Sequence, residues 1–125
     1  MTSLARTVAA ALAAACLSLA AAATAHAAGA LAVGNCGAYG FAYDFKQEKA
    51  ARTAALRKCA GGCKVVAAMK RNCAALAVDG ANACGAYGFA AASRLGPAQN
   101  SALHQCYQYG GKDCVIRAFV CDAKG

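Results

Sequence analysis

The chain contains one seven-residue segment twice, and this repeat limits the possible folds more than any other feature. The segment Cys-Gly-Ala-Tyr-Gly-Phe-Ala occupies residues 36–42 and recurs without change at 84–90. Upstream, the run Ala-Leu-Ala-Val at 30–33 recurs at 75–78, and downstream each copy passes a glycine pair before an apolar run that begins with cysteine. Such a match, in the same order along the chain, indicates a duplicated unit.

Each copy begins with two predicted strands. In the first copy, apolar or alternating runs cover residues 30–33 and 36–43. The Gly-Asn pair at 34–35 between them favours a tight hairpin turn. A third strand is predicted at 64–69, and its counterpart at 114–121 closes the second copy.

A helix is predicted between the second and third strands of each copy. We expect Asp44 to cap the first helix, with Gln47 three places on, and Pro97 to stand at the first position of the second helix. Both segments are rich in helix-forming residues, and a glycine pair after each supplies a left-handed stop. Their apolar stripes are Ala51, Ala55 and Cys59 in the first copy, and Ala98, Ala102 and Cys106 in the second.

These elements predict an α+β fold: a tandem duplicated β-β-α-β unit with mostly antiparallel sheet, two helices packed on it and pseudo-two-fold symmetry. The domain is expected to span residues 28–125, with the copies at about 30–71 and 74–121.

The repeated segment predicts strands with two unlike faces, because successive side chains alternate across a strand. The bare Ala and Gly face allows an alanine-striped helix to approach closely. The aromatic face consists of Tyr39, Phe41, Tyr43, Tyr87 and Phe89. We favour a core layer or an interface between the copies for this face; the alternative is an exposed platform for sugars, peptides or bases.

Residues 1–27 have the pattern of an export signal. An uncharged run rich in Ala and Leu follows Arg6 and ends in Ala25-His26-Ala27, a small-x-small cleavage pattern. An uncleaved membrane anchor is one alternative, although alanine is only weakly lipophilic. A lipoprotein signal ending at Cys16 is another, but the chain lacks the bulky aliphatic residue expected three places earlier. We therefore expect a secreted or periplasmic protein without a membrane span after cleavage.

The cysteines predict a disulfide framework. Nine occur in the chain, and removal of Cys16 with the leader leaves an even set of eight. In an exported chain of this size, a small core needs such bonds and the compartment permits them. Zinc binding is the alternative, but no Cys-x-x-Cys pair occurs, so we expect no metal site.

Repeat symmetry selects one pairing scheme. The cysteine at the end of each helix is expected to pair with the cysteine that begins the following strand. The cysteines of the two repeated segments pair with each other, and the two cysteines left over form the fourth bond. The predicted bonds are Cys59–Cys63, Cys106–Cys114, Cys36–Cys84 and Cys73–Cys121. A bond between copies closes a long loop and contributes about 4 kcal/mol in the loop-entropy description.

Positive charge is concentrated in the first copy. The whole chain has 13 Lys and Arg against five Asp and Glu. A cationic patch on the first helix is predicted at Lys46, Lys49, Arg52, Arg57 and Lys58. Such a patch attracts anionic envelope polymers, phospholipid headgroups or an acidic protein. The alternative is a solvated face that serves solubility. No nucleic-acid motif is present, so we expect no nucleic-acid partner.

The residues do not indicate catalysis. After the leader, the single histidine is His104, and no nucleophile has a visible base partner. Asp44 is interpreted as a helix cap and Asp79 as part of a turn, so no carboxylate pair is indicated. We expect neither an enzyme nor a bound cofactor.

Several motifs in one order resemble a known family. They are the two repeated segments, the helix end Ala-Ala-Leu-Arg-Lys-Cys at 54–59, the run Asn-Cys-Ala-Ala-Leu-Ala-Val at 72–78 and the closing strand at 114–121. Over nearly all of the chain after the leader, they resemble the bacterial secreted family called domain of unknown function 4189. The resemblance implies an exported, alanine- and cysteine-rich domain with no established activity, ligand or catalytic residues.

Together these features predict a disulfide-stabilised binding or interaction module, most simply a monomer, whose partner is an anionic envelope component or another protein. An inhibitor or immunity-type protein directed against a secreted or wall-active enzyme is an alternative. An enzyme acting on an envelope polymer is a third possibility, and it requires a cleft with convergent acids.

Overall fold

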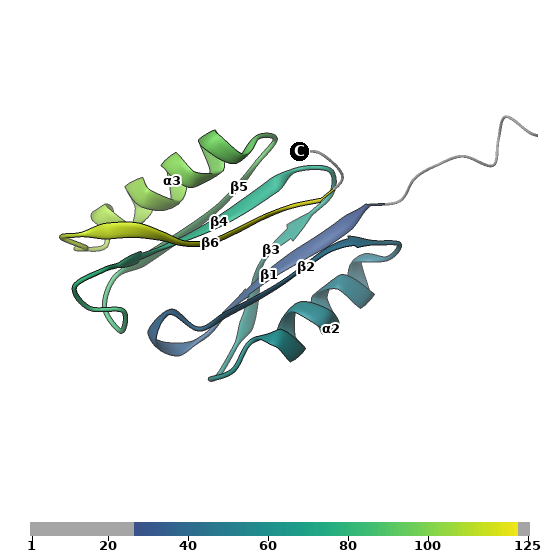
Figure 1. Ribbon diagram of the computed structural model, residues 1–125, viewed down its shortest axis with the longest axis horizontal. Coiled ribbons are helices and arrows are strands. Elements are labelled where there is room, and N and C mark those ends of the chain that lie inside the picture. The colour runs from purple at the N-terminus through teal and green to yellow at the C-terminus, as the bar shows by residue number, and fades with distance from the viewer. Residues whose placement is uncertain (1–26, 123–125) are drawn as a thin grey trace, which may run out of the picture.

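The computed structural model describes residues 27–122 as two three-stranded antiparallel sheets packed face to face, with one helix on the outer side of each (Figure 1). The strand orders are β2-β1-β3 and β5-β4-β6, so the first strand of each unit lies in the centre of its sheet. The α+β class and the antiparallel pairing are therefore confirmed. Residues 1–26, which hold Cys16 and nearly all of the predicted leader, lie outside the described residues.

The first unit follows the predicted element order. Its elements are β1 (Ala28–Val33), the 3-10 turn η1 (Asn35–Gly37), β2 (Tyr39–Phe45), α2 (Glu48–Lys58) and β3 (Lys64–Met69). The glycine pair after α2 has the left-handed backbone expected of a helix stop, with φ of 110° at Gly61 and 67° at Gly62.

The second unit has the same order of strands and helix. Its elements are β4 (Cys73–Asp79), β5 (Tyr87–Ala92), α3 (Leu95–Gln108) and β6 (Cys114–Cys121). Among the described residues, neither helix is long and apolar enough to cross a membrane.

The predicted two-residue hairpin turn is wrong. The link from β1 to β2 is longer and contains η1, and β2 begins at Tyr39 instead of at Cys36. The Gly34 N–H donates to the Ala38 carbonyl at 2.8 Å, which closes the loop, and the Asn35 N–H donates to the Gly61 carbonyl at 2.8 Å. These bonds leave Cys36 with a φ of 54° at the tip.

Both predicted helix starts also need correction. Asp44 does not cap α2, because β2 continues to Phe45 and keeps Asp44 in the strand; Gln47 precedes the helix, without a side-chain cap. Pro97 is the third residue of α3, not the first. It still lies in the first turn, where the missing N–H breaks no intrahelical bond.

Each helix lies directly on a glycine of the neighbouring strand. A Cβ at Gly40 would collide with the Ala55 carbonyl of α2, and one at Gly88 with the Ala102 carbonyl of α3. The buried residues under each helix are mostly alanine and cysteine. The predicted close approach over the bare face of the repeated segment is thus present in both units.

The larger aliphatic side chains fill the space between the two sheets. Leu31 and Met69 from the first sheet meet Leu76 from the second, and all three are nearly inaccessible to solvent. Tyr39, Phe41 and Phe89 pack against this cluster while partly buried. Most of the aromatic face therefore borders the central core.

Four disulfides stabilise the described chain, and they join the pairs that repeat symmetry predicts. They are Cys36–Cys84, Cys59–Cys63, Cys73–Cys121 and Cys106–Cys114. Cys73 and Cys121 face each other on β4 and β6, so their bond lies within the second sheet. Of the four, Cys36–Cys84 alone joins the two units.

At the end of the molecule opposite the Cys36–Cys84 bond, a buried carboxylate binds the link between the two units. Asp122 is fully buried, and it accepts hydrogen bonds from the backbone N–H groups of Arg71 at 2.7 Å and Asn72 at 2.8 Å. These bonds fix the short link between β3 and β4. Asp122 therefore has a structural role.

We predict that Gly40→Ala and Gly88→Ala each lower the free energy of unfolding by about 1–3 kcal/mol, because the added methyl group forces the helix away from the sheet. Gly96→Ala is the control, since a Cβ there meets no atom within 4 Å. Urea denaturation measures all three. Equal stability of the Gly40 and Gly96 variants would contradict the close packing.

We also predict that the stability lost on removing a disulfide increases with the length of the loop that the bond closes. Replacing both Cys36 and Cys84 with Ser should cost about 4 kcal/mol, because the bond spans 48 residues. The same change at Cys59 and Cys63 should cost about 2 kcal/mol, because that bond spans four residues. Thermal unfolding of the oxidised variants tests this order, and a larger loss for the local pair would refute it.

Candidate functional site

The predicted cationic residues surround α2 and are called the basic face here: Lys46 precedes the helix, and Lys49, Arg52, Arg57 and Lys58 lie within it. All five side chains are exposed. Ala51 and Ala55 hold the inner side of the helix against the sheet, and Lys49, Arg52 and Arg57 lie on the side that faces solvent. The ion pair recorded on α2 joins Arg52 to Glu48 at 3.1 Å.

Two side chains of the basic face lie on one line with a threonine between them. Lys49, Thr53 and Arg57 are spaced four residues apart and occupy the same side of the helix. They border a shallow hollow of about 500 Å³ that also includes Phe45 and Gln47. Lys49 and Arg57 line this hollow from helix positions about 12 Å apart along the axis.

The second helix, α3, packs on its sheet in the same way as α2 but differs in charge. α3 contains no Lys, Arg, Asp or Glu, and its one ionisable group with a basic side chain is the exposed His104. The charge difference between the units, expected from the sequence, is thus displayed on two equivalent outer faces.

The predicted aromatic residues form rows on β2 and β5. The rings of Tyr39 and Phe41 are 6.1 Å apart and nearly parallel, and those of Tyr87 and Phe89 are 6.5 Å apart. Tyr43 extends the first row and is 51% exposed. Tyr39, Phe41 and Phe89 pack against the core, whereas Tyr43 and Tyr87 are exposed. Ligand binding by the exposed rings stays a prediction.

Arg117 links the units near the first aromatic row. Its guanidinium lies 5.5 Å from the centre of the Tyr39 ring, and its Nε donates to the Gly37 carbonyl at 3.4 Å. β6 therefore holds the loop that carries Cys36. Sequence reasoning missed this contact, because no local pattern marks a side chain that reaches the other unit.

A larger hollow opens between the units beside the Cys36–Cys84 bond. Its volume is about 610 Å³, and its floor includes the buried side chains of Val33, Leu76 and Val78. Lys64 is the one charged residue among those that line it.

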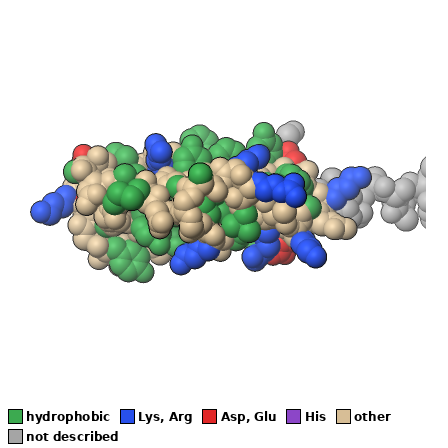
Figure 2. All heavy atoms as spheres, turned by 90° about the horizontal axis from the view of Figure 1, so that it is seen from below, with side chains coloured by type: hydrophobic (Ala, Val, Ile, Leu, Met, Phe, Trp, Pro, Cys, Tyr) green, Lys and Arg blue, Asp and Glu red, His purple; other side chains and the backbone are tan. Residues whose placement is uncertain are grey.

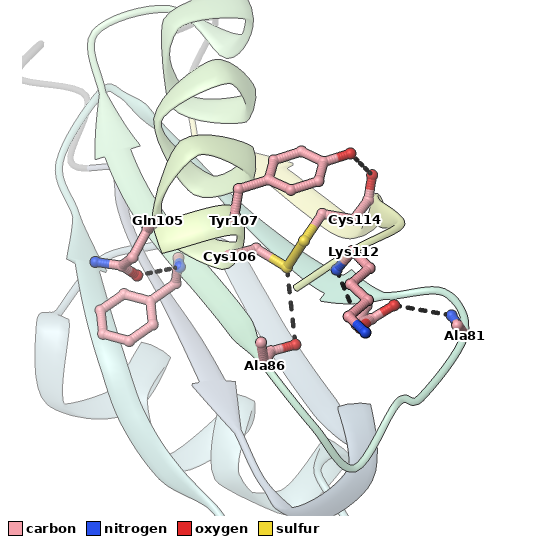
Figure 3. Close-up of a disulfide and its surroundings, with 9 residues drawn as sticks. Ala81, Ala86, Gln105, Cys106, Tyr107, Lys112 and Cys114 are labelled. Atoms are coloured by element: carbon pink, nitrogen blue, oxygen red, sulfur yellow. Dashed lines mark hydrogen bonds between the residues drawn. A yellow bond between two sulfur atoms is a disulfide. The ribbon is translucent and has the colours of Figure 1, made fainter. Parts of the chain in front are cut away.

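A third hollow, the β5 hollow, lies between the start of β5 and the end of α3. It has a volume of about 420 Å³ and is lined by Gly85, Ala86, Tyr87, Phe89, Gln105 and Tyr109. The Gln105 side-chain oxygen accepts a hydrogen bond from the Phe89 N–H at 2.7 Å (Figure 3). Gln105 and Tyr109 were not predicted; the longer link between Cys106 and Cys114 was the available signal.

The acidic residues do not gather in any of these three hollows. None of the hollows is lined by Asp or Glu. Within residues 27–122, no group of three His, Cys, Asp or Glu side chains is placed to hold a metal ion. Asp79 closes the turn after β4, where it accepts hydrogen bonds from the N–H groups of Ala81 at 3.0 Å and Lys112 at 3.3 Å.

Comparison with known proteins identifies a family. A family model described as a domain of unknown function, DUF4189, matches residues 28–121. No curated protein and no solved structure matches the chain.

The Asp79 turn gives a pH prediction. Hydrogen bonds from the N–H groups of Ala81 and then Lys112 hold the pKa of Asp79 below its ordinary value of 3.8. A lowered folded-state pKa stabilises the fold above pH 3.8, and this contribution disappears as the pH falls through the folded-state pKa. Asp79→Asn should therefore be less stable than the parent at neutral pH, with the difference narrowing in acid.

Urea denaturation at neutral pH and in strong acid measures this difference. Asp113→Asn is the control, because that exposed side chain accepts no recorded backbone bond in the turn. A stability gap for Asp79→Asn that stays constant with pH would contradict the role of its charge.

Proposed function

We propose that this chain, which belongs to the family called domain of unknown function (DUF4189), is an exported binding module that attaches to an anionic envelope component through the basic face of α2. The observation that carries the proposal is the unequal charge of the two outer helices. α2 displays Lys49, Arg52, Arg57 and Lys58, whereas α3 displays no Lys or Arg.

Solubility alone does not explain this inequality. If the charges served solubility alone, charged side chains would be expected on both of the equivalent helices. Figure 2, which views the molecule from below Figure 1, shows separate Lys and Arg side chains on a surface that is otherwise mostly apolar or uncharged, with few acidic side chains among them. The resulting positive field attracts anions over a distance comparable to the Debye length, about 8–10 Å.

The spacing of the cations favours a polymer or a surface over a single small anion. Lys49 and Arg57 flank a shallow hollow and are two helical turns apart. A chain or layer with repeated anionic groups reaches both at once, and the contacts then add through effective concentration.

Export is supported by the cysteines. All eight in the described residues form disulfides, which persist mainly in oxidising compartments. The leader pattern at residues 1–27 agrees with this assignment.

An inhibitor or immunity-type role is the alternative, in which the same basic face meets an acidic region of a secreted enzyme. The two roles differ in stoichiometry, because a protein partner forms a defined complex whereas a polymer binds many copies.

We predict that changing Lys46, Lys49, Arg52 and Arg57 to Ala makes the oxidised protein elute from an anionic matrix at lower salt, because the patch is removed. The matched control changes Lys64, Lys70, Arg94 and Lys112 to Ala, which removes the same charge from other exposed sites. Equal loss of retention in both variants would mean that net charge alone is responsible, and this would overturn the proposed site.

A further inference from the structure

We propose that the β5 hollow is a subsite for an uncharged sugar ring, separate from the basic face of α2. The residues that line it combine three aromatic rings with one side-chain amide and include no charged group. A pyranose has the complementary surface, since its C–H faces pack on aromatic rings while its hydroxyl groups need hydrogen-bond partners.

The amide of Gln105 is fixed in the orientation that this role requires. Its oxygen meets the Phe89 N–H, so the nitrogen must point the other way, away from the strand (Figure 3). Among residues 27–122, no group accepts a recorded hydrogen bond from that nitrogen. Two N–H donors are thus presented beside the aromatic rings, and a ligand with hydroxyl groups satisfies them.

The same hydrogen bond disfavours a peptide. β5 lies at the edge of its sheet, and an extended peptide would bind there by pairing with outward backbone groups. The outward N–H of Phe89 is already occupied by Gln105. Strand addition at this position would have to break that bond.

The first unit shows why the subsite occurs only in the second. The residue before the helix-end cysteine is Gln105 in α3 but Lys58 in α2, where the ammonium lies 6.0 Å from the centre of the Phe41 ring. The link from helix to strand also differs, because its cysteines are eight residues apart in the second unit and four in the first. The longer link carries Tyr109, which is 68% exposed and forms one wall of the hollow.

The test is an NMR titration of the oxidised protein with two neutral probes, cellotriose and the β-1,4-linked trimer of N-acetylglucosamine, in high salt that screens the basic face. We expect shifts at the Gln105 side-chain amide and at residues 85–89 with at least one probe. Tyr109→Ala should weaken this binding by about fivefold, whereas Tyr109→Phe should retain most of it because the ring remains.

Tyr43→Ala is the matched control, since Tyr43 is an exposed tyrosine of the first unit outside the hollow. Thermal unfolding confirms that each variant is folded. The proposal fails if neither trisaccharide shifts these resonances, if Tyr43→Ala weakens binding as much as Tyr109→Ala, or if a neutral proline-rich peptide binds at the hollow and the sugars do not. None of these outcomes bears on the anionic-matrix experiment.

Discussion

The contact on which the structure depends is the direct seating of each helix on a strand glycine. At Gly40 and Gly88 the helix backbone takes the space that a side chain would fill, so the layers beneath α2 and α3 are thin and composed largely of alanine. Thin layers bury little apolar surface, and a small domain is only marginally stable because its whole core is small. The aliphatic cluster between the sheets and the four disulfides supply what these layers lack.

Much of this arrangement was predictable because it follows from local periodicity and from the repeat. Residues 64–69 and 114–121 form strands at the predicted bounds, and the glycine pair after α2 adopts the expected left-handed backbone. The errors occur where tertiary contacts override local preference. The Asn35 N–H bonds to the Gly61 carbonyl, in a longer turn than the predicted one. Asp44 remains within β2, at a register shift of the β1–β2 ladder, and so does not stand at the start of a helix.

One candidate site was predictable from the sequence and the other was not. The basic face of α2 follows from helical spacing, because buried alanines on one side require exposed residues on the other. The β5 hollow does not, since it arises where Gln105 and Tyr109 from one element meet Tyr87 and Phe89 from another. Which edge of an aromatic row stays open depends on the length of a neighbouring link. That length was visible in the sequence, but its effect on the hollow was not.

Both ends of the described chain lie at one end of the sandwich, and the hollow between the units lies at the other. The chain enters at β1 and leaves after β6 at the end where Asp122 holds the link between the sheets (Figure 1). The Cys36–Cys84 bond and the hollow beside it lie at the far end. A tether joined to either end of the described chain would orient the molecule with this hollow outward. Immobilised protein should therefore keep that end accessible to molecules in solution.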